Sequence, residues 1–334
     1  MSDGKPGAVG RTLRIVLPFV VSAAFIGWVL ADVDIAGVWA ALTPRVAAWF
    51  VPGLLAFLAI TLYIEAVCLV VVVRDYHGHT ELWEAAKMKA ASYLLGILNY
   101  ALGAGAVAIL LRKRTTLSLS DAGGVVLLIG LFDLGSLLVA AGLGPLLLGG
   151  AGTGVRVAGV LLAVAAIVLG FVVLRLPRPL GPLDVLRDLE IFRAARTVSA
   201  RCLATLGVLR ALFIASFILL SWTTMNAFAV FVPWLELVVK VAVMLLVAAI
   251  PIAVAGLGTG QKVFVELFAG HAPPETLLAA SLTLSFGLIV SRAMMGLFFA
   301  REYTREAYAA SRAGELEDDG ADATVEGDME GREG

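Results

Sequence analysis

Six stretches of the sequence are long and apolar enough to cross a lipid bilayer as helices. A helix needs about 20 mostly apolar residues to span the hydrocarbon core of about 30 Å, because each residue rises about 1.5 Å along the axis. Hydrophobic residues make up 60% of the chain and charged residues 15%, whereas a soluble domain has roughly 45–50% and about 25%. The sequence therefore predicts an all-α polytopic membrane protein. The predicted spans are residues 13–31, 46–73, 122–147, 157–174, 206–231 and 276–300.

Two further apolar stretches, 83–111 and 234–270, are interrupted by residues that break or loosen a helix. Two full crossings would need about 40 residues, and the first stretch has 29. We therefore expect each stretch to enter the membrane and leave on the same side, as a re-entrant helical hairpin. Close packing of helices through small residues is the alternative reason for the glycines. The interrupting residues are Asn99, Gly103 and Gly105 in the first stretch, and Pro251, Gly256, Gly258 and Gly260 in the second.

Basic residues indicate which side of the membrane each loop faces. Lys and Arg accumulate in short cytoplasmic loops, and a cytoplasmic N-terminus places 19 of the 25 basic residues on that side. This holds only if 83–111 returns to the cytoplasm, since a single crossing would export the basic cluster at 112–114. For the last span to end in the cytoplasm, 234–270 must likewise enter and leave on the same side, here the outer side. We expect a multi-pass protein of the cell membrane with both termini in the cytoplasm.

The resulting order of elements predicts an inverted repeat. Two spans, a hairpin and a span are followed by the same four elements in the opposite orientation, an arrangement that recurs in secondary transporters. The linker contains either an amphipathic helix on the inner leaflet or a plain solvated connector. The predicted parts are a cytoplasmic N-terminus 1–12, a first membrane half 13–174, a cytoplasmic linker 175–205, a second membrane half 206–300 and an acidic, disordered cytoplasmic tail 301–334.

Two charged residues lie inside predicted spans, at similar places in the two inverted halves. Asp133 occupies the middle of 122–147, and Arg292 lies deep in the last span. A lone charge at a helix centre costs about 2.5–3.5 kcal/mol on insertion scales, so each should face the protein interior and find a partner. We expect the two to pair or to bind opposite ends of a zwitterionic headgroup, with a purely structural ion pair as the alternative.

Two carboxylates in apolar segments have candidate partners nearby. Glu65 lies two to three turns deep in 46–73. It is either a substrate or proton site, or a group that pairs with Arg210 or reaches back to the interface. Glu236 stands four residues before Lys240, a spacing that places opposite charges on one helix face. We expect these two to pair near the outer surface.

The two interruptions carry further candidate contacts for a substrate. Asn99 and Gln261 can donate and accept hydrogen bonds there. Lys262 directly follows the second glycine run, where a helix N-terminus and an ammonium together suit a phosphate oxygen. Lys262 also stands four residues before Glu266, so an ion pair on one helix face is the alternative.

The sequence gives no reason to expect metal, cofactor or nucleic-acid chemistry. The two cysteines and three histidines form no cluster with metal-ligand spacing. No P-loop, nucleophile elbow or HExxH motif is present, and the glycine run at 253–260 lacks the βαβ context of a dinucleotide site. Basic and acidic residues nearly balance, at 25 against 26. We therefore expect no enzyme activity, no cofactor and no nucleic-acid partner.

Several short motifs accompany the interruptions and the charged spans. They are Asn99-Tyr-Ala-Leu-Gly-Ala-Gly, the basic cluster 112–114, Asp133, Pro251-Ile-Ala-Val-Ala-Gly-Leu-Gly-Thr-Gly-Gln, and Arg292. Together they resemble the transmembrane region of lysylphosphatidylglycerol synthases, over about residues 11–305. The resemblance implies a flippase-like fold with two re-entrant hairpins. In bifunctional members of that family this region translocates aminoacylated phospholipid.

The chain departs from this family's pattern at four positions. Members often carry proline at Gly103, a Gly-Glu pair at Val107 and Ala108, and glutamate at Gln261. The missing carboxylates weaken the expectation of a cationic aminoacyl lipid as cargo. The soluble aminoacyl-transfer domain is also absent from the sequence, so synthesis of the lipid is not implied.

The sequence thus favours a flippase or transporter of a phospholipid or lipid-linked substrate, working by alternating access at a central polar cavity. Its expected partners are membrane lipids. The alternative is a membrane partner that transports nothing and positions a separate glycosyl- or aminoacyl-transferase. Homo-oligomer formation is left open.

Overall fold

A computed structural model describes residues 40–76, 78–98, 100–148, 153–176, 189–248 and 259–299. Within these residues the chain is almost entirely helical, and five helices are long and apolar enough to cross a membrane. These are Pro44–Asp75, Leu119–Gly142, Val157–Arg175, Ala200–Ala227 and Pro274–Phe299. The first predicted span, 13–31, and the predicted tail, 301–334, lie outside the described residues.

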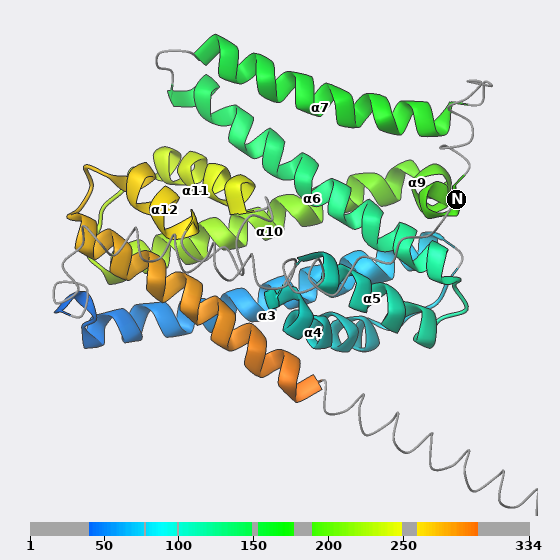
Figure 1. The fold of residues 1–334 in the computed structure, drawn as a ribbon, viewed down its shortest axis with the longest axis horizontal. Coiled ribbons are helices and arrows are strands. Elements are labelled where there is room, and N and C mark those ends of the chain that lie inside the picture. The colour runs from blue at the N-terminus through cyan, green and yellow to red at the C-terminus, as the bar shows by residue number, and fades with distance from the viewer. Residues whose placement is uncertain are drawn as a thin grey trace, which may run out of the picture.

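Figure 1 shows the helices as one elongated bundle. In chain order they are α3 (Pro44–Asp75), α4 (Leu82–Leu98), α5 (Tyr100–Arg114), α6 (Leu119–Leu148), α7 (Thr153–Arg175), the short 3-10 helix η1 (Glu190–Phe192), α9 (Arg193–Thr197), α10 (Ala200–Ala227), α11 (Trp234–Ala248), α12 (Thr259–Phe268) and the last helix, Pro274–Phe299.

The helix α10 differs most from its predicted span, because capping contacts that hydropathy does not register fix both of its ends. It begins six residues early, where the side chain of Ser199 accepts a hydrogen bond from the amide of Cys202 at 3.1 Å. It ends four residues early, at Ala227, and Ala229 just beyond its end has a φ of 56°. The amide of Val230 then donates to the carbonyl of Met225 at 2.8 Å, as in a Schellman motif.

The centre of the bundle is the pair formed by α3 and α10, which run side by side in opposite directions (Figure 1). The two backbones approach closely at Gly53, where an added Cβ would lie 2.7 Å from Oγ1 of Thr223. Small residues at such contacts let membrane helices pack tightly. Helix α7 lies at the edge of the bundle and leaves apolar side chains such as Leu162 exposed.

The helices bury two separate hydrophobic cores, one at each end of the bundle. The first, which includes Leu128 and Leu206, lies where α3 ends and α6 begins; we name this the linker end. The second, which includes Phe57 and Phe264, lies at the opposite end. Helices α3, α6 and α10 extend from one core to the other, so a polar residue in the middle of one of these helices is held by packing on both sides.

Two helix pairs return the chain to the end from which they start. The hydroxyl of Tyr76, just before α4, donates to Asp121 at the start of α6 at 2.5 Å, so α4 and α5 begin and finish at the linker end. In the same way, His271 after α12 lies 2.9 Å from Glu236 at the start of α11. The α4–α5 pair and the α11–α12 pair occupy opposite ends of the bundle (Figure 1).

The predicted breaks at Gly103 and Gly105 are wrong, because both glycines lie within α5. Helix α4 ends at Leu98 and α5 begins at Tyr100, and Asn99 between them lies outside the described residues. Gly103 instead permits close packing, since an added Cβ there would lie 2.8 Å from the Cα of Gly96 on α4. Gly260 similarly falls in the first turn of α12. Of the other predicted breaks, Pro251, Gly256 and Gly258 lie outside the described residues.

The predicted linker, 175–205, contains parts of several helices. Residues 200–205 belong to α10, and residues 190–197 form the short helices η1 and α9. Residues 177–188, which carry much of the predicted amphipathic helix, lie outside the described residues.

Candidate functional site

Asp133 and Arg210 form an ion pair between the two hydrophobic cores. A guanidinium nitrogen of Arg210 on α10 donates to Oδ1 of Asp133 on α6 at 2.7 Å. The side chain of Arg210 is 2% exposed and that of Asp133 is 29% exposed. The predicted pairing of Asp133 with Arg292 is therefore wrong. On α10, Arg210 stands one turn after Leu206 of the first core and one turn before Ile214 of the second.

A second group forms around Glu65 of α3, joined to two residues of α4. One carboxylate oxygen lies 3.3 Å from Nζ of Lys89, and the other accepts a hydrogen bond from the hydroxyl of Tyr93 at 2.7 Å. Lys89 and Tyr93 are four residues apart, so both face the same side of α4. One alternative for Glu65 was an ion pair with Arg210. In the structure the cation that pairs with Glu65 is Lys89. Arg210 still acts electrostatically on the carboxylate.

Arg292 of the last helix joins the same group through an aromatic ring. Its guanidinium carbon lies 5.6 Å from the centre of the Tyr93 ring, within the range of a cation–π contact. Among the described residues it forms no ion pair. Its positive charge also acts on Glu65. Tyr93 therefore connects Arg292 to Glu65, with its ring facing one and its hydroxyl bonded to the other.

These residues make up what we call the central polar cluster, and their sequence positions place it deep in the bundle. Glu65 stands ten residues before the end of α3, Arg210 ten after the start of α10, and Asp133 fourteen after the start of α6. At about 1.5 Å per residue they lie about 15–21 Å from the linker end, near the middle of a hydrocarbon core of about 30 Å. The cluster consists of Glu65, Lys89, Tyr93, Asp133, Arg210 and Arg292.

The cluster contains more positive than negative charge. Three cations, Lys89, Arg210 and Arg292, face two carboxylates. In addition, Nε of Arg210 is buried without an oxygen or nitrogen acceptor among the described residues, and the sulfur of Cys68 is only a weak acceptor for this guanidinium. Buried polar groups are nearly always paired, so an unfilled donor beside a surplus positive charge is a site that an anion or a bound water would complete.

Two other predicted contacts lie on α12, outside the central polar cluster. The side-chain amide of Gln261 is buried and donates to Ser285 on the last helix at 3.0 Å. Lys262 pairs with Glu266 at 3.1 Å, and both side chains face outward at 33% and 62% exposure. The alternative given for Lys262, an ion pair on one helix face, is confirmed. Asn99 lies outside the described residues.

Sequence reasoning identified three members of the cluster as a site and missed Lys89 and Tyr93. Lys89 was counted only among the cytoplasmic basic residues. It stands seven residues into α4, however, about 10 Å along the helix, and this depth was the available indication. Tyr93 had no such indication, because a tyrosine in an apolar stretch is ordinary.

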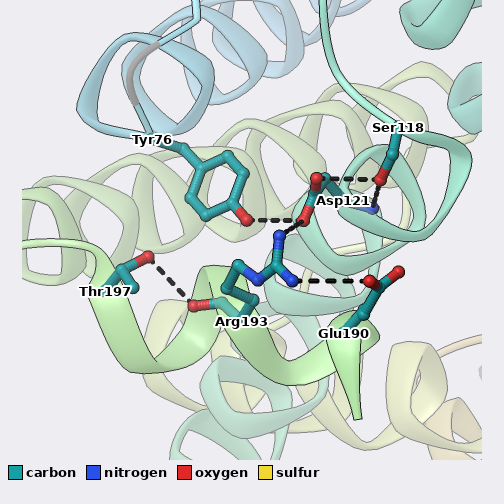
Figure 2. Close-up of polar contacts among 6 residues, drawn as sticks. All are labelled: Tyr76, Ser118, Asp121, Glu190, Arg193 and Thr197. Atoms are coloured by element: carbon teal, nitrogen blue, oxygen red, sulfur yellow. Dashed lines mark hydrogen bonds and ion pairs between the residues drawn. The ribbon is translucent and has the colours of Figure 1, made fainter. Parts of the chain in front are cut away.

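A second polar group closes the linker end, and Figure 2 shows it. Tyr76 and Ser118 donate to the Asp121 carboxylate at 2.5 and 2.8 Å, and Arg193 of α9 lies 3.4 Å from it. Arg193 also lies 3.4 Å from Glu190. We name this group the linker latch, because it fastens the linker to the ends of α3 and α6. Burial and the Asp121 carboxylate raise the pKa of Tyr76 to about 12.

Replacing Tyr76 with phenylalanine is expected to lower the free energy of unfolding by about 1.5 kcal/mol, because a hydrogen bond to a charged carboxylate is lost. The raised pKa makes the effect depend on pH. The hydrogen bond contributes fully below about pH 10, the usual tyrosine value, and the contribution is lost as pH rises toward about 12. Equilibrium unfolding in detergent at pH 8 and pH 11 should therefore show a smaller difference between wild type and variant at pH 11. An equal difference at both values would contradict the role given to Tyr76.

At the opposite end, the predicted pair Glu236 and Lys240 is confirmed. His271 completes the group, with its Nε2 2.9 Å from Glu236 and 3.3 Å from Lys240. Hydrogen bonds from Lys240 and His271 lower the pKa of the Glu236 carboxyl. This contact holds the far end of α12 to the start of α11, so the second helix pair is fastened at its base as the first is.

The comparison with protein families agrees with this membrane architecture. The family model described as the lysylphosphatidylglycerol synthase transmembrane region matches residues 15–288. The match includes every residue of the central polar cluster except Arg292. The comparison with curated proteins gives no match. Because the matched region covers most of the chain, this multi-pass membrane protein belongs to the family of the lysylphosphatidylglycerol synthase transmembrane region.

Proposed function

We propose that this chain moves a phospholipid or lipid-linked substrate across the membrane, exposing the central polar cluster alternately to the two sides. The observation that carries the proposal is a charged cluster deep in the bundle, where the first hydrophobic core ends and the second begins. Charged side chains at that depth are costly and usually mark the pathway of a substrate or ion. Acyl chains can stay in lipid while a headgroup passes the cluster, so only the headgroup has to find polar partners.

The proposed transport relies on an inverted repeat, whose two halves would move relative to each other. In it, α3 corresponds to α10, the α4–α5 pair to the α11–α12 pair, and α6 to the last helix. The contacts support this correspondence. Helix α6 packs on α11, and the last helix packs on α4, where an added Cβ at Gly296 would lie 2.8 Å from Leu94. Two related halves of this kind can rock around one central site.

The α4–α5 and α11–α12 pairs act in this proposal as re-entrant hairpins from opposite sides of the membrane. At about 1.5 Å per residue, α4 and α5 are about 25 and 22 Å long, shorter than a hydrocarbon core of about 30 Å. The basic residues at 112–114 favour a cytoplasmic position for the linker end. No ATP-binding motif occurs in the sequence, so transport is downhill or coupled to an ion.

Single cysteines test the proposed topology. The chain's own Cys68 and Cys202 are buried, which leaves new surface cysteines as the reactive ones. Glu81→Cys before α4 and Lys113→Cys at the end of α5 should react with a membrane-impermeant maleimide from the same side. Phe231→Cys after α10, where the side chain is 76% exposed, should react from the other side. Labelling of positions 81 and 113 from opposite sides would remove the hairpin and the repeat.

Vesicles test transport itself. The purified protein is reconstituted with lipids that carry a fluorophore on one acyl chain, and dithionite then bleaches the label in the outer leaflet. Without transport about half of the label is protected, whereas movement between leaflets exposes nearly all of it. Equal protection with and without protein would reject the proposal. It would favour the alternative of a non-transporting partner, which predicts co-purification of a transferase that depends on the linker.

A further inference from the structure

We infer that the headgroup bound at the central polar cluster carries a net negative charge, and that Arg292 contacts its phosphate. This inference rests on the proposed function, because it names the class of substrate for the same site. It follows from which charges of the cluster are already paired and which are not.

Both carboxylates of the cluster are committed to partners within the protein. Asp133 accepts from Arg210 at 2.7 Å, and Glu65 is shared by Lys89 at 3.3 Å and Tyr93 at 2.7 Å. A positively charged group on the lipid headgroup, such as an ammonium, would have to displace one of these partners. It would also add a fourth positive charge to three that lie close together in a medium of low dielectric constant, where like charges repel strongly.

Arg292 is the cation of the cluster that has no ion pair among the described residues. Its guanidinium lies over the Tyr93 ring at 5.6 Å, and among the described residues no carboxylate lies within 4.0 Å of it. A guanidinium has five N–H donors in a fixed fork that matches phosphate oxygens, and contact with a ring face leaves these donors available. The buried Nε of Arg210 is a further donor without an oxygen or nitrogen acceptor in the described part of the chain.

Tyr93 determines where this phosphate contact lies. Its hydroxyl is fixed by Glu65, so its ring gives Arg292 a fixed platform. The phosphate would therefore sit between the last helix and α4. In the proposed repeat these two helices belong to different halves, so a bound anion would bridge the parts that move.

Native mass spectrometry of the detergent-purified protein tests this inference without requiring transport. The probes are phosphatidylglycerol, which is anionic, phosphatidylcholine, which is zwitterionic, and lysylphosphatidylglycerol, which is cationic, all with the same acyl chains. Wild type should bind phosphatidylglycerol about tenfold more tightly than the other two, the effect of one charge-assisted phosphate contact. Arg292→Gln should bring the ratio close to one, and Arg292→Lys, which keeps the charge and loses the planar fork, should give an intermediate ratio.

The matched control is Arg112→Gln, which removes one exposed cation at the end of α5, away from the cluster. It should leave the preference unchanged. Equal binding of the three lipids by wild type overturns the inference, and so does an equal effect of the two glutamine variants. If Arg292→Gln fails to fold, the wild-type ratio and Arg292→Lys still decide the question. Loss of transport in vesicles with the preference intact would reject the proposed function and keep this inference.

Discussion

Asp133→Asn is expected to lower the free energy of unfolding by about 3–5 kcal/mol, because it leaves a buried guanidinium without its counter-ion. Arg210 is 2% exposed and donates to Asp133 at 2.7 Å, and its own stem is fixed between the two cores. Arg210→Gln should cost a similar amount, since it leaves the Asp133 carboxylate at lipid depth without a cation. Equilibrium unfolding in detergent measures both values.

The double variant Asp133→Asn with Arg210→Gln separates stability from function. With both charges gone, its loss of stability should be well below the sum of the single losses, so the cycle yields a coupling energy of about 1–3 kcal/mol. If the central polar cluster carries transport, this folded double variant should still fail to move labelled lipid in the vesicle assay. Normal transport by a stable double variant would reduce the pair to a structural tie. Additive single losses would contradict the contact itself.

Gly103→Leu is expected to lower the free energy of unfolding by about 3 kcal/mol, at the upper end of the usual cost of overpacking. Even a Cβ at Gly103 would lie 2.8 Å from the Cα of Gly96 and 3.1 Å from its amide nitrogen. Both are backbone atoms of α4, so no side-chain rotation can relieve the clash. The two helices would have to separate, which would displace Lys89 and Tyr93 from Glu65.

Gly105→Leu is the matched control, because it makes the same change two residues later on the same helix. Among the described residues, nothing outside the backbone of its own helix lies within 4 Å of a Cβ at Gly105, and the residue is exposed. We expect little loss of stability, and a small gain of about 0.5–1 kcal/mol for Gly105→Ala from better helix propensity. Unfolding of the two variants in detergent, with the vesicle assay alongside, measures the contrast. Equal effects at the two glycines would show that α5 does not pack on α4 as described.

The spans themselves could be predicted because hydropathy reports directly on the thickness of the bilayer. Helices α3 and α7 and the last helix lie within a few residues of their predicted bounds. The predicted bounds were wrong where a local contact, and not the end of the apolar run, sets where a helix begins or ends. Ser199 caps α10 well before the apolar run begins, and the positive φ of Ala229 ends it before the run is over.

The site could be predicted only in part, because depth follows from sequence position and partners do not. Asp133 and Arg292 were found by their depth, and both lie in the central polar cluster. Their predicted pairing was wrong because two residues at equal depth meet only if their helices face each other. Arg210 of the neighbouring α10 is the residue that faces Asp133.

The sequence alone determined that the chain is a helical membrane protein, where its long helices run, and that Glu65, Asp133 and Arg292 lie too deep to be freely solvated. These conclusions depend on composition and on distance along a helix, and both are local properties. The tertiary structure decided which charges pair. It also decided that Gly103 lets α5 pack closely on α4 and does not interrupt the helix, and that Arg292 contacts the ring of Tyr93. Those outcomes depend on how each helix is rotated about its axis and which neighbour it meets, and no property of a single helix contains that information.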